Sequence, residues 1–377
     1  MTLHGPTPTA LQQLAPLISE DGGRRRARTL LALVAAGPDY VAARLPDLHA
    51  FMGEASPGMD ELTGLIDAVR TATSPAAPTV SEQHVISRVL LRRWTEQGKP
   101  GAGRQLMRYD VLSGASKLRS VAQLGYVLDF VKIDSLAVEK VWQRVENHLG
   151  EAITAAEDGS LRQRSSSQRI LREAIALHFV RSPIAAAVHE YTWKAVSKNR
   201  IRALAGTPLA VEAFRRSHGG LVPAGPEGRR MGAEAVLARL AEAHESGAIF
   251  RLLIEERFDR VCELLDPAPL EVIVPARHHE FILGDVPALT FDGKTGAAGV
   301  ADGVPLTGGD TVMLPLGPRL LVALGPRHQT ATVGQEVVER INRLQLRAAT
   351  EYMVHRPGAR MGSQLAGWRP PAGPGAH

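Results

Sequence analysis

The sequence predicts an α+β fold: a predominantly helical body with a small, mostly antiparallel sheet formed late in the chain. Apolar residues recur at helical spacing along most of the chain as far as Leu265. From Leu270 onward they gather in short runs between Pro, Gly and Asp, which is typical of strands. Helices and strands do not alternate along the chain, as a doubly wound parallel sheet would require, so the α/β class is not indicated.

The first 75 residues are predicted to form a helical extension in front of the main domain. Leu11, Leu14 and Leu17 step at helical spacing, and Gly-Gly and Ser-Pro-Gly breaks divide the segment into short helices. Residues 76–80 continue a stretch rich in Pro, Ala and Thr, which is typical of a linker. The core domain is therefore expected to begin at residue 81 and to reach residue 356.

The helical part of the core domain is predicted to cover residues 81–265. One strand is expected inside it, because residues 104–111 alternate in polarity and stop at a Ser-Gly turn. Gly247 marks a weak point within the last helical stretch, and an Asp-Pro pair ends that stretch. The expected helices occupy residues 81–97, 136–157, 167–182, 184–204, 207–218 and 232–265.

A strand-rich part is predicted over residues 270–325, where the apolar runs are short and bounded by turn residues. Helical spacing returns in a closing helix at residues 334–355, and the Gly- and Pro-rich end at residues 357–377 is expected to be a flexible tail. The expected strands are residues 270–274, 280–283, 311–314 and 320–324.

The charge balance is mildly basic. The chain has 44 Lys and Arg against 39 Asp and Glu, and 37 of the 44 cations are Arg. Planar guanidinium groups suit phosphate and carboxylate recognition, but a genome that encodes Arg in place of Lys gives the same excess, and the abundant Ala and Gly favour that explanation. Aromatic residues are only 5%, which argues against base stacking on nucleic acid and leaves phosphate contact open.

Compartment and redox state are indicated by what the sequence lacks. Its single cysteine, Cys262, excludes a disulfide framework and lies on an apolar helical stripe, where a free thiol behaves as a small hydrophobe. No signal peptide pattern and no apolar run of about 18 residues is present. A cytoplasmic protein with no membrane association is expected.

The strong catalytic motifs are absent, which makes a P-loop NTPase, a Rossmann enzyme, a zincin or an α/β hydrolase less probable. Two weaker patterns remain. His278 and His279 with Asp285 suggest a metal site, but neighbouring residues on a strand point to opposite faces, so ligands from elsewhere would be needed. Glu139 and Glu146 stand seven residues apart on one helix face, about 10.5 Å along the axis, either facing a cleft or forming a solvated flank.

Four segments, taken in order, go beyond general pattern. They are residues 81–94, which begin Ser-Glu-Gln-His, residues 175–183, which end Arg-Ser-Pro, residues 281–287, which contain Gly-Asp-Val-Pro, and residues 313–318, which end Pro-Leu-Gly-Pro. In this order they resemble a bacterial family filed as domain of unknown function 4238, over about residues 81–355. The resemblance implies an intracellular bacterial protein and gives no established reaction.

The match to the family is partial. Ser87 stands where Pro is usual, Gly284 and Val286 replace the Ser and Asn beside the matched Asp, and Gly317 replaces a Ser. If that polar triplet were catalytic in the family, this chain would retain only its carboxylate. The residues that match are Gln83, His84, Arg181, Pro183, Asp285, Pro287, Pro315 and Pro318.

Each matched polar residue has a functional and a structural interpretation. His84 is a general base or metal ligand, or it hydrogen-bonds the backbone at a helix start. Asp285 is a metal ligand or base, or it ties a turn. Arg181 clamps an anion, or it complements a helix dipole and pairs with a carboxylate. The candidate catalytic residues are His84 and Asp285; the candidate substrate-binding residues are Arg181, Gln83, Arg88 and Arg92.

Two classes of function therefore stay open. In the first, the chain is an anion- or phosphate-binding or nucleic-acid-acting hydrolase that uses a His/Asp/Arg cleft, with a divalent metal as a candidate cofactor. In the second, it is a non-catalytic binding or interaction protein in which these residues hold the fold together. Convergence of His84, Arg181 and Asp285 on an open cleft would favour the first.

Overall fold

Strands form at both ends of the core domain. In the computed structural model, β1 (Glu82–His84), β2 (Glu96–Gln97), β3 (Arg104–Asp110), β4 (Ser116–Arg119) and β5 (Tyr126–Leu128) all precede the long helices. The prediction of one small, late sheet is therefore wrong, although the mixed class and the strand expected at residues 104–111 are confirmed. The structure describes residues 80–98, 103–132, 135–196, 200–218, 224–266, 268–300, 304, 306, 309–359 and 361–368. The predicted N-terminal extension lies outside these residues.

The strands form a two-stranded ribbon and two five-stranded sheets. The ribbon pairs β1 with β5. The first sheet has the order β2-β3-β12-β7, with β4 also paired to β3, and the second has the order β11-β6-β10-β9-β8. The sequence predicts mostly antiparallel pairing, and every pairing in the described chain is antiparallel except that of β11 with β6. The later strands are β6 (Leu270–Pro275), β7 (Leu283–Gly284), β8 (Leu289–Phe291), β9 (Thr311–Gly317), β10 (Leu320–Leu324), β11 (Gln329–Val333) and β12 (Tyr352–His355).

The closing helix is shorter than the sequence indicates. Helix α13 (Gln335–Ala348) ends before residue 350, and the chain then forms β12, which lies between β3 and β7. Backbone groups of Thr350 and Glu351 are held by the Asp285 carboxylate, which turns the chain out of the helix. A further helix, α14 (Met361–Trp368), occupies part of the segment predicted as a flexible tail.

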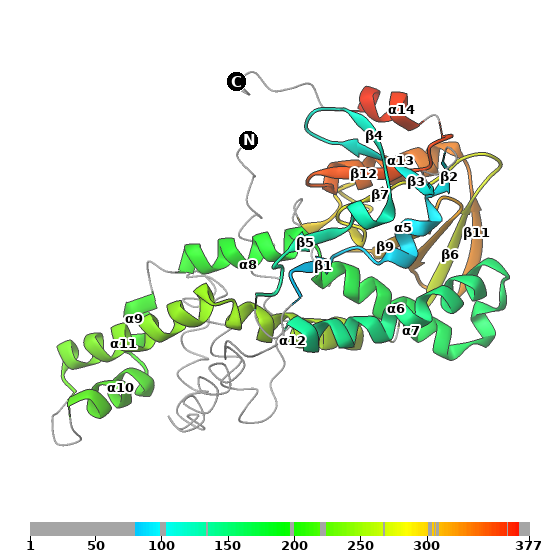
Figure 1. The fold of residues 1–377 in the computed structure, drawn as a ribbon. Coiled ribbons are helices and arrows are strands. Elements are labelled where there is room, and N and C mark those ends of the chain that lie inside the picture. Colours follow the sequence, from blue (N-terminus) through cyan, green and yellow to red (C-terminus); the bar gives the residue numbers. More distant parts are fainter. Residues whose placement is uncertain are drawn as a thin grey trace.

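Helices α6, α7 and α12 pack beside the sheets (Figure 1), and side chains of these helices and of the strands together form the main hydrophobic core. Its largest buried side chains include Trp94 and Trp142, and the Trp94 indole donates a hydrogen bond to the Phe281 carbonyl, which joins α5 to the second half of the chain. Gly247 separates α11 from α12, as predicted. These helices are α5 (Arg88–Arg93), α6 (Ser135–Glu157), α7 (Ser165–Val180), α8 (Pro183–Val196), α11 (Pro226–Glu245) and α12 (Ala248–Leu265).

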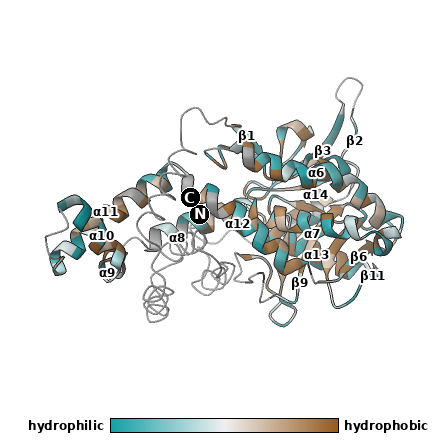
Figure 2. Ribbon diagram, turned by 90° about the horizontal axis from the view of Figure 1, so that it is seen from below, coloured by the Kyte–Doolittle hydropathy of each residue, from teal (hydrophilic) through white to brown (hydrophobic). Residues whose placement is uncertain are grey.

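Helices α9 (Arg200–Ala205), α10 (Pro208–His218) and α11 form an arm that projects away from the sheets (Figures 1 and 2). The arm has a small core of its own, which includes Trp193, Leu204 and Leu240. Gly232 lets α10 and α11 approach closely, because a Cβ there would lie 1.8 Å from the carbonyl oxygen of Ala210. Within the described part of the chain, no helix is both long and apolar enough to cross a membrane.

Candidate functional site

A buried arginine at the end of α7 organises the main polar cluster. Arg181 follows the last helical residue of α7 and precedes the Ser-Pro pair that starts α8, so the chain turns at this point. Its side chain is fully buried. The Arg181 Nη2 donates to Glu146 Oε1 at 2.6 Å and to Ser87 Oγ at 3.1 Å. Three elements that are distant in sequence, α5, α6 and α7, therefore meet at one guanidinium group. Arg181, Glu146 and Ser87, together with the adjacent His178 and Glu139, are called the Arg181 cluster below.

His178 supports this cluster from the preceding turn of α7. Its Nδ1 lies 2.7 Å from the Ala174 carbonyl oxygen and its Nε2 accepts the Ser87 N–H at 3.2 Å, so the neutral ring carries its proton on Nδ1. Burial, followed by the charge of Arg181, lowers the pKa of His178 to about 4. His178 therefore stays neutral and fixes the start of α5.

The two glutamates of α6 lie in unlike environments. Glu146 accepts hydrogen bonds from Arg181 and from Ser87 Oγ at 2.8 Å. Burial acts to raise its pKa, but Arg181 and these hydrogen bonds outweigh burial and lower it. Burial raises the pKa of Glu139, with Glu146 adding to the effect against the opposing charge of Arg181. Two carboxyl groups whose pKa values are driven apart are a recurring acid–base arrangement.

Several polar atoms in the cluster lack partners. Neither Nε nor Nη1 of Arg181 has a hydrogen-bond partner among the described residues, and the same holds for the buried Oε1 of Glu139. The Arg181 guanidinium carbon lies 5.0 Å from the centre of the Trp142 ring, which supplies a cation–π contact. Since roughly nine in ten buried polar groups are paired in native proteins, these unpaired atoms set the cluster apart from an ordinary buried ion pair.

His84 and Arg88 lie at the more exposed side of this cluster. The Arg88 Nε donates to His84 Nε2 at 2.9 Å, and the His84 ring lies 6.2 Å from that of Tyr126 on the paired strand. Burial, and then the charge of Arg88, lowers the pKa of His84; the carboxylate of Glu146 opposes this shift and the charge of Arg181 adds to it. The imidazole is therefore neutral near pH 7 and shares the electrostatic field of the Arg181 cluster.

The other two predicted substrate-binding residues occupy different positions. Gln83 is buried, and its amide exchanges two hydrogen bonds with the Val131 backbone and donates a third to Val80, so its hydrogen-bonding groups are engaged by the backbone. Arg92 is exposed on α5, one turn beyond Arg88. Only Arg92 of these two is open to a ligand.

Asp285 lies apart from His84 and Arg181 in its contacts. It is buried, and its carboxylate accepts the Thr350 and Glu351 backbone N–H groups and the Thr350 hydroxyl. Burial raises its pKa in spite of these hydrogen bonds. The structure thus brings His84 and Arg181 together, whereas Asp285 holds the start of β12, so the three residues do not converge on one open cleft.

The remaining sequence patterns are resolved as follows. No group of three or more His, Cys, Asp or Glu side chains is placed to hold a metal ion within the described ranges. The region of His278 and His279 is a turn, not a strand, so the two residues are not forced onto opposite faces. Burial raises the pKa of the Cys262 thiol to about 12, which matches the unreactive thiol expected from the sequence.

Comparison with known protein families gives a match over most of the chain. A family model described as "Protein of unknown function (DUF4238)" matches residues 82–359. The chain belongs to this family. No curated protein and no solved structure matches the chain.

Membership in DUF4238 gives the position of Ser87 added interest. The resemblance described in the sequence analysis leads us to expect Pro at this point, and a proline has neither the N–H that Ser87 donates to His178 nor the hydroxyl that it donates to Glu146. The Ser87 backbone, at φ −57° and ψ 130°, has a conformation that Pro also adopts. Ser87 therefore makes three hydrogen bonds in the Arg181 cluster that a proline could not make, from a backbone conformation that suits either residue. The sequence alone places Glu139 and Glu146 on one helix face and does not indicate that both interact with Arg181.

Proposed function

We propose that the chain is a hydrolase that acts on a phosphate-bearing substrate by general acid–base catalysis at the Arg181 cluster. One observation carries the proposal: Arg181 and Glu139 keep unpaired polar atoms in a buried site in which Glu146, Ser87 and His178 are all hydrogen-bonded. A planar guanidinium with free N–H groups suits a phosphate, and its buried position makes the interaction strong.

Each residue then has a defined role. Arg181 and Arg88 bind the phosphate, and a phosphate that draws Arg88 away frees the Nε2 lone pair of His84. His84 accepts a proton from the attacking water as the new P–O bond forms. Glu139, whose pKa is raised, donates its proton to the leaving oxygen as the old P–O bond breaks. Nucleic acid is one member of this substrate class, and the bacterial cytoplasm is the compartment we propose.

The test compares wild type with Glu139→Gln, which keeps the shape of the side chain and removes its transferable proton. Hydrolysis is measured on p-nitrophenyl phosphate, bis-p-nitrophenyl phosphate and single-stranded RNA, each with and without Mg²⁺ or Mn²⁺. We expect Glu139→Gln to lose activity roughly 10²–10⁴-fold. It should keep its melting temperature, because a carboxyl that favours the neutral form resembles an amide.

The matched control is Glu151→Gln on the same helix, whose side chain is 71% exposed. It should retain wild-type activity. Full activity in Glu139→Gln would remove the acid–base role, and absence of turnover on every substrate by wild type would remove the hydrolase.

The alternative is a non-catalytic binding protein in which the matched residues are structural. The contacts of Gln83 and Asp285 favour it, because their side-chain oxygens accept hydrogen bonds mainly from the backbone. Under this alternative, wild type binds phosphate esters without turning them over, and Glu139→Gln binds as tightly as wild type.

A further inference from the structure

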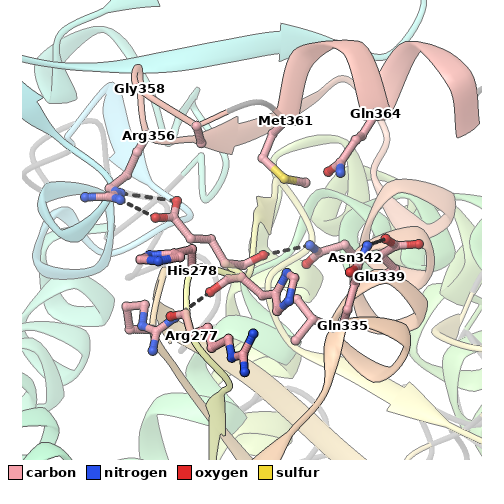
Figure 3. Close-up of a pocket in the computed structure, with 14 residues that line it drawn as sticks. Arg277, His278, Gln335, Glu339, Asn342, Arg356, Gly358, Met361 and Gln364 are labelled. Atoms are coloured by element: carbon pink, nitrogen blue, oxygen red, sulfur yellow. Dashed lines mark hydrogen bonds and ion pairs between the residues drawn. The ribbon is translucent and has the colours of Figure 1, made fainter.

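A pocket of about 770 Å³ lies between the loop that joins β6 to β7, helix α13 and the segment that leads into α14. Its volume lies within the range of small-molecule sites, which is roughly 300–1,000 Å³. In Figure 3 Arg277 and His278 of the loop lie on one side, Met361 and Gln364 of α14 on a second, and Asn342 of α13 on a third. None of its lining residues belongs to the Arg181 cluster.

The loop that forms one wall has an unusual backbone. Arg277 has a φ of 51°, a left-handed conformation that is unfavourable for a side chain other than Gly and that tends to occur at functional sites. Arg319 holds this conformation, because its Nη1 donates to the carbonyl oxygens of both Arg277 and His279. The strained turn places the Arg277 side chain at the pocket.

The remainder of the wall is fixed by hydrogen bonds. Asn342 is buried, donates to the Glu280 carbonyl at 2.8 Å and accepts the Ile282 N–H at 3.0 Å. The Arg356 guanidinium pairs with the Glu280 carboxylate (Figure 3). It also reaches Glu96 at 3.4 Å. The acidic groups of the pocket are thereby neutralised: Glu280 by Arg356, and Glu339 by Arg343 at 3.6 Å.

Uncompensated positive charge remains. Arg277 and His278 are both exposed, and neither side chain has a hydrogen-bond or ion-pair partner among the described residues. The floor also presents the side-chain amides of Gln335 and Gln364 and the apolar side chain of Met361. The guanidinium of Arg277 and the imidazole N–H of His278 at one wall, with amide and apolar groups beside them, are complementary to a ligand that has an anionic end and a flat or apolar body.

We propose that this pocket binds a phosphate-bearing small molecule of nucleotide size, with Arg277 and His278 contacting the phosphate. An inorganic ion alone would leave most of the volume unfilled. The proposal is separate from hydrolysis at the Arg181 cluster, because it concerns binding by different residues.

The test is calorimetric titration of the full chain with ATP, AMP, pyrophosphate and adenosine. We expect ATP and AMP to bind, adenosine to show no binding, and Arg277→Gly to weaken ATP binding by roughly tenfold or more. Gly relieves the positive φ, so the melting temperature of Arg277→Gly should equal or exceed that of wild type.

The matched control is Asp129→Gly, which makes the same change at the other described non-glycine residue with positive φ, 50°, away from the pocket. It should bind ATP as wild type does. Glu139→Gln should also bind normally, which separates this site from the proposed hydrolytic one. His278→Ala repeats the test should Arg277→Gly not fold. Equal binding of ATP and adenosine, or wild-type affinity in both pocket variants, would overturn the proposal.

Discussion

Asp285 and His84 match the same family pattern, yet their side chains make opposite kinds of contact. Asp285 is buried and accepts three hydrogen bonds, whereas His84 is half-buried and bonds an exposed Arg88. Asp285→Ala removes a buried acceptor and breaks three part-buried hydrogen bonds, so it should lower the free energy of unfolding by about 2 kcal/mol or more. His84→Ala should lower it by less than about 1 kcal/mol. Urea denaturation of both variants measures the difference.

Asp292 supplies the control for that comparison. It accepts the same set of bonds, two from backbone N–H groups and one from a threonine hydroxyl, but in an exposed turn. Asp292→Ala should cost well under the loss seen for Asp285→Ala, since water replaces its hydrogen bonds. Equal losses in the two aspartate variants would show that burial is not what makes Asp285 important.

The candidate site could be predicted only in part from single residues. The spacing of Glu139 and Glu146 placed both on one helix face, and both interact with Arg181. Arg181 comes from the far end of the next helix, and Ser87 joins it from α5. Both contacts depend on how three helices pack, which no local pattern encodes. The partner that Asp285 holds lies 65 residues later, so its role also depended on tertiary contacts.

At the scale of elements, the junction between α11 and α12 depends on one backbone conformation. Gly247 has a φ of 82°, and a Cβ there would approach Lys132 Cβ at 3.0 Å. Gly247→Ala should therefore destabilise the protein by about 1 kcal/mol or more in thermal or urea unfolding. Gly225→Ala is the control, because Gly225 precedes α11 with a φ of −62° and has no atom within 4 Å of its Cβ position. A similar small effect in both variants would contradict this explanation.

The predicted helices were largely recovered, whereas several strands were missed for identifiable reasons. Strand β1 has only three residues, and β4 is exposed along most of its length, so neither shows an apolar alternation. Strand β12 is buried at all four residues and follows α13 without Gly or Pro between them, so its Tyr-Met-Val-His run extends the helical pattern. Periodicity cannot separate a buried strand from a buried helix segment at this length.

At the scale of the whole molecule, two buried histidines predict a dependence of stability on pH. Burial lowers the pKa of His178 to about 4 and of His189 to about 3, below the value of 6.5 expected in the unfolded chain. Between these values the unfolded state binds more protons, so stability is complete above pH 6.5 and falls as the solution is acidified. The free energy of unfolding should fall by about 1 kcal/mol per pH unit for each histidine between pH 6.5 and 5, and the slope approaches about 1.4 kcal/mol per pH unit at the acidic end of this range.

His189→Leu isolates one of the two contributions. His189 packs against Phe250, with ring centres 5.1 Å apart, and its Nε2 has no partner among the described residues. The variant should fold and show a shallower pH slope, reduced by about one proton, in urea titrations at pH 7, 6 and 5. An unchanged slope would mean that His189 does not titrate between the folded and unfolded states.

The position of β12 has a consequence for biosynthesis. A ribosome has translated residues 82–351 before the strand that joins β3 to β7 exists, and until then those two strands face each other without a common partner. Unpaired strand edges of a nascent chain are open to other chains. The first sheet therefore closes only after Tyr352–His355 has been translated, and a chain released before Tyr352 would carry the two halves of its core domain without the strand that unites them.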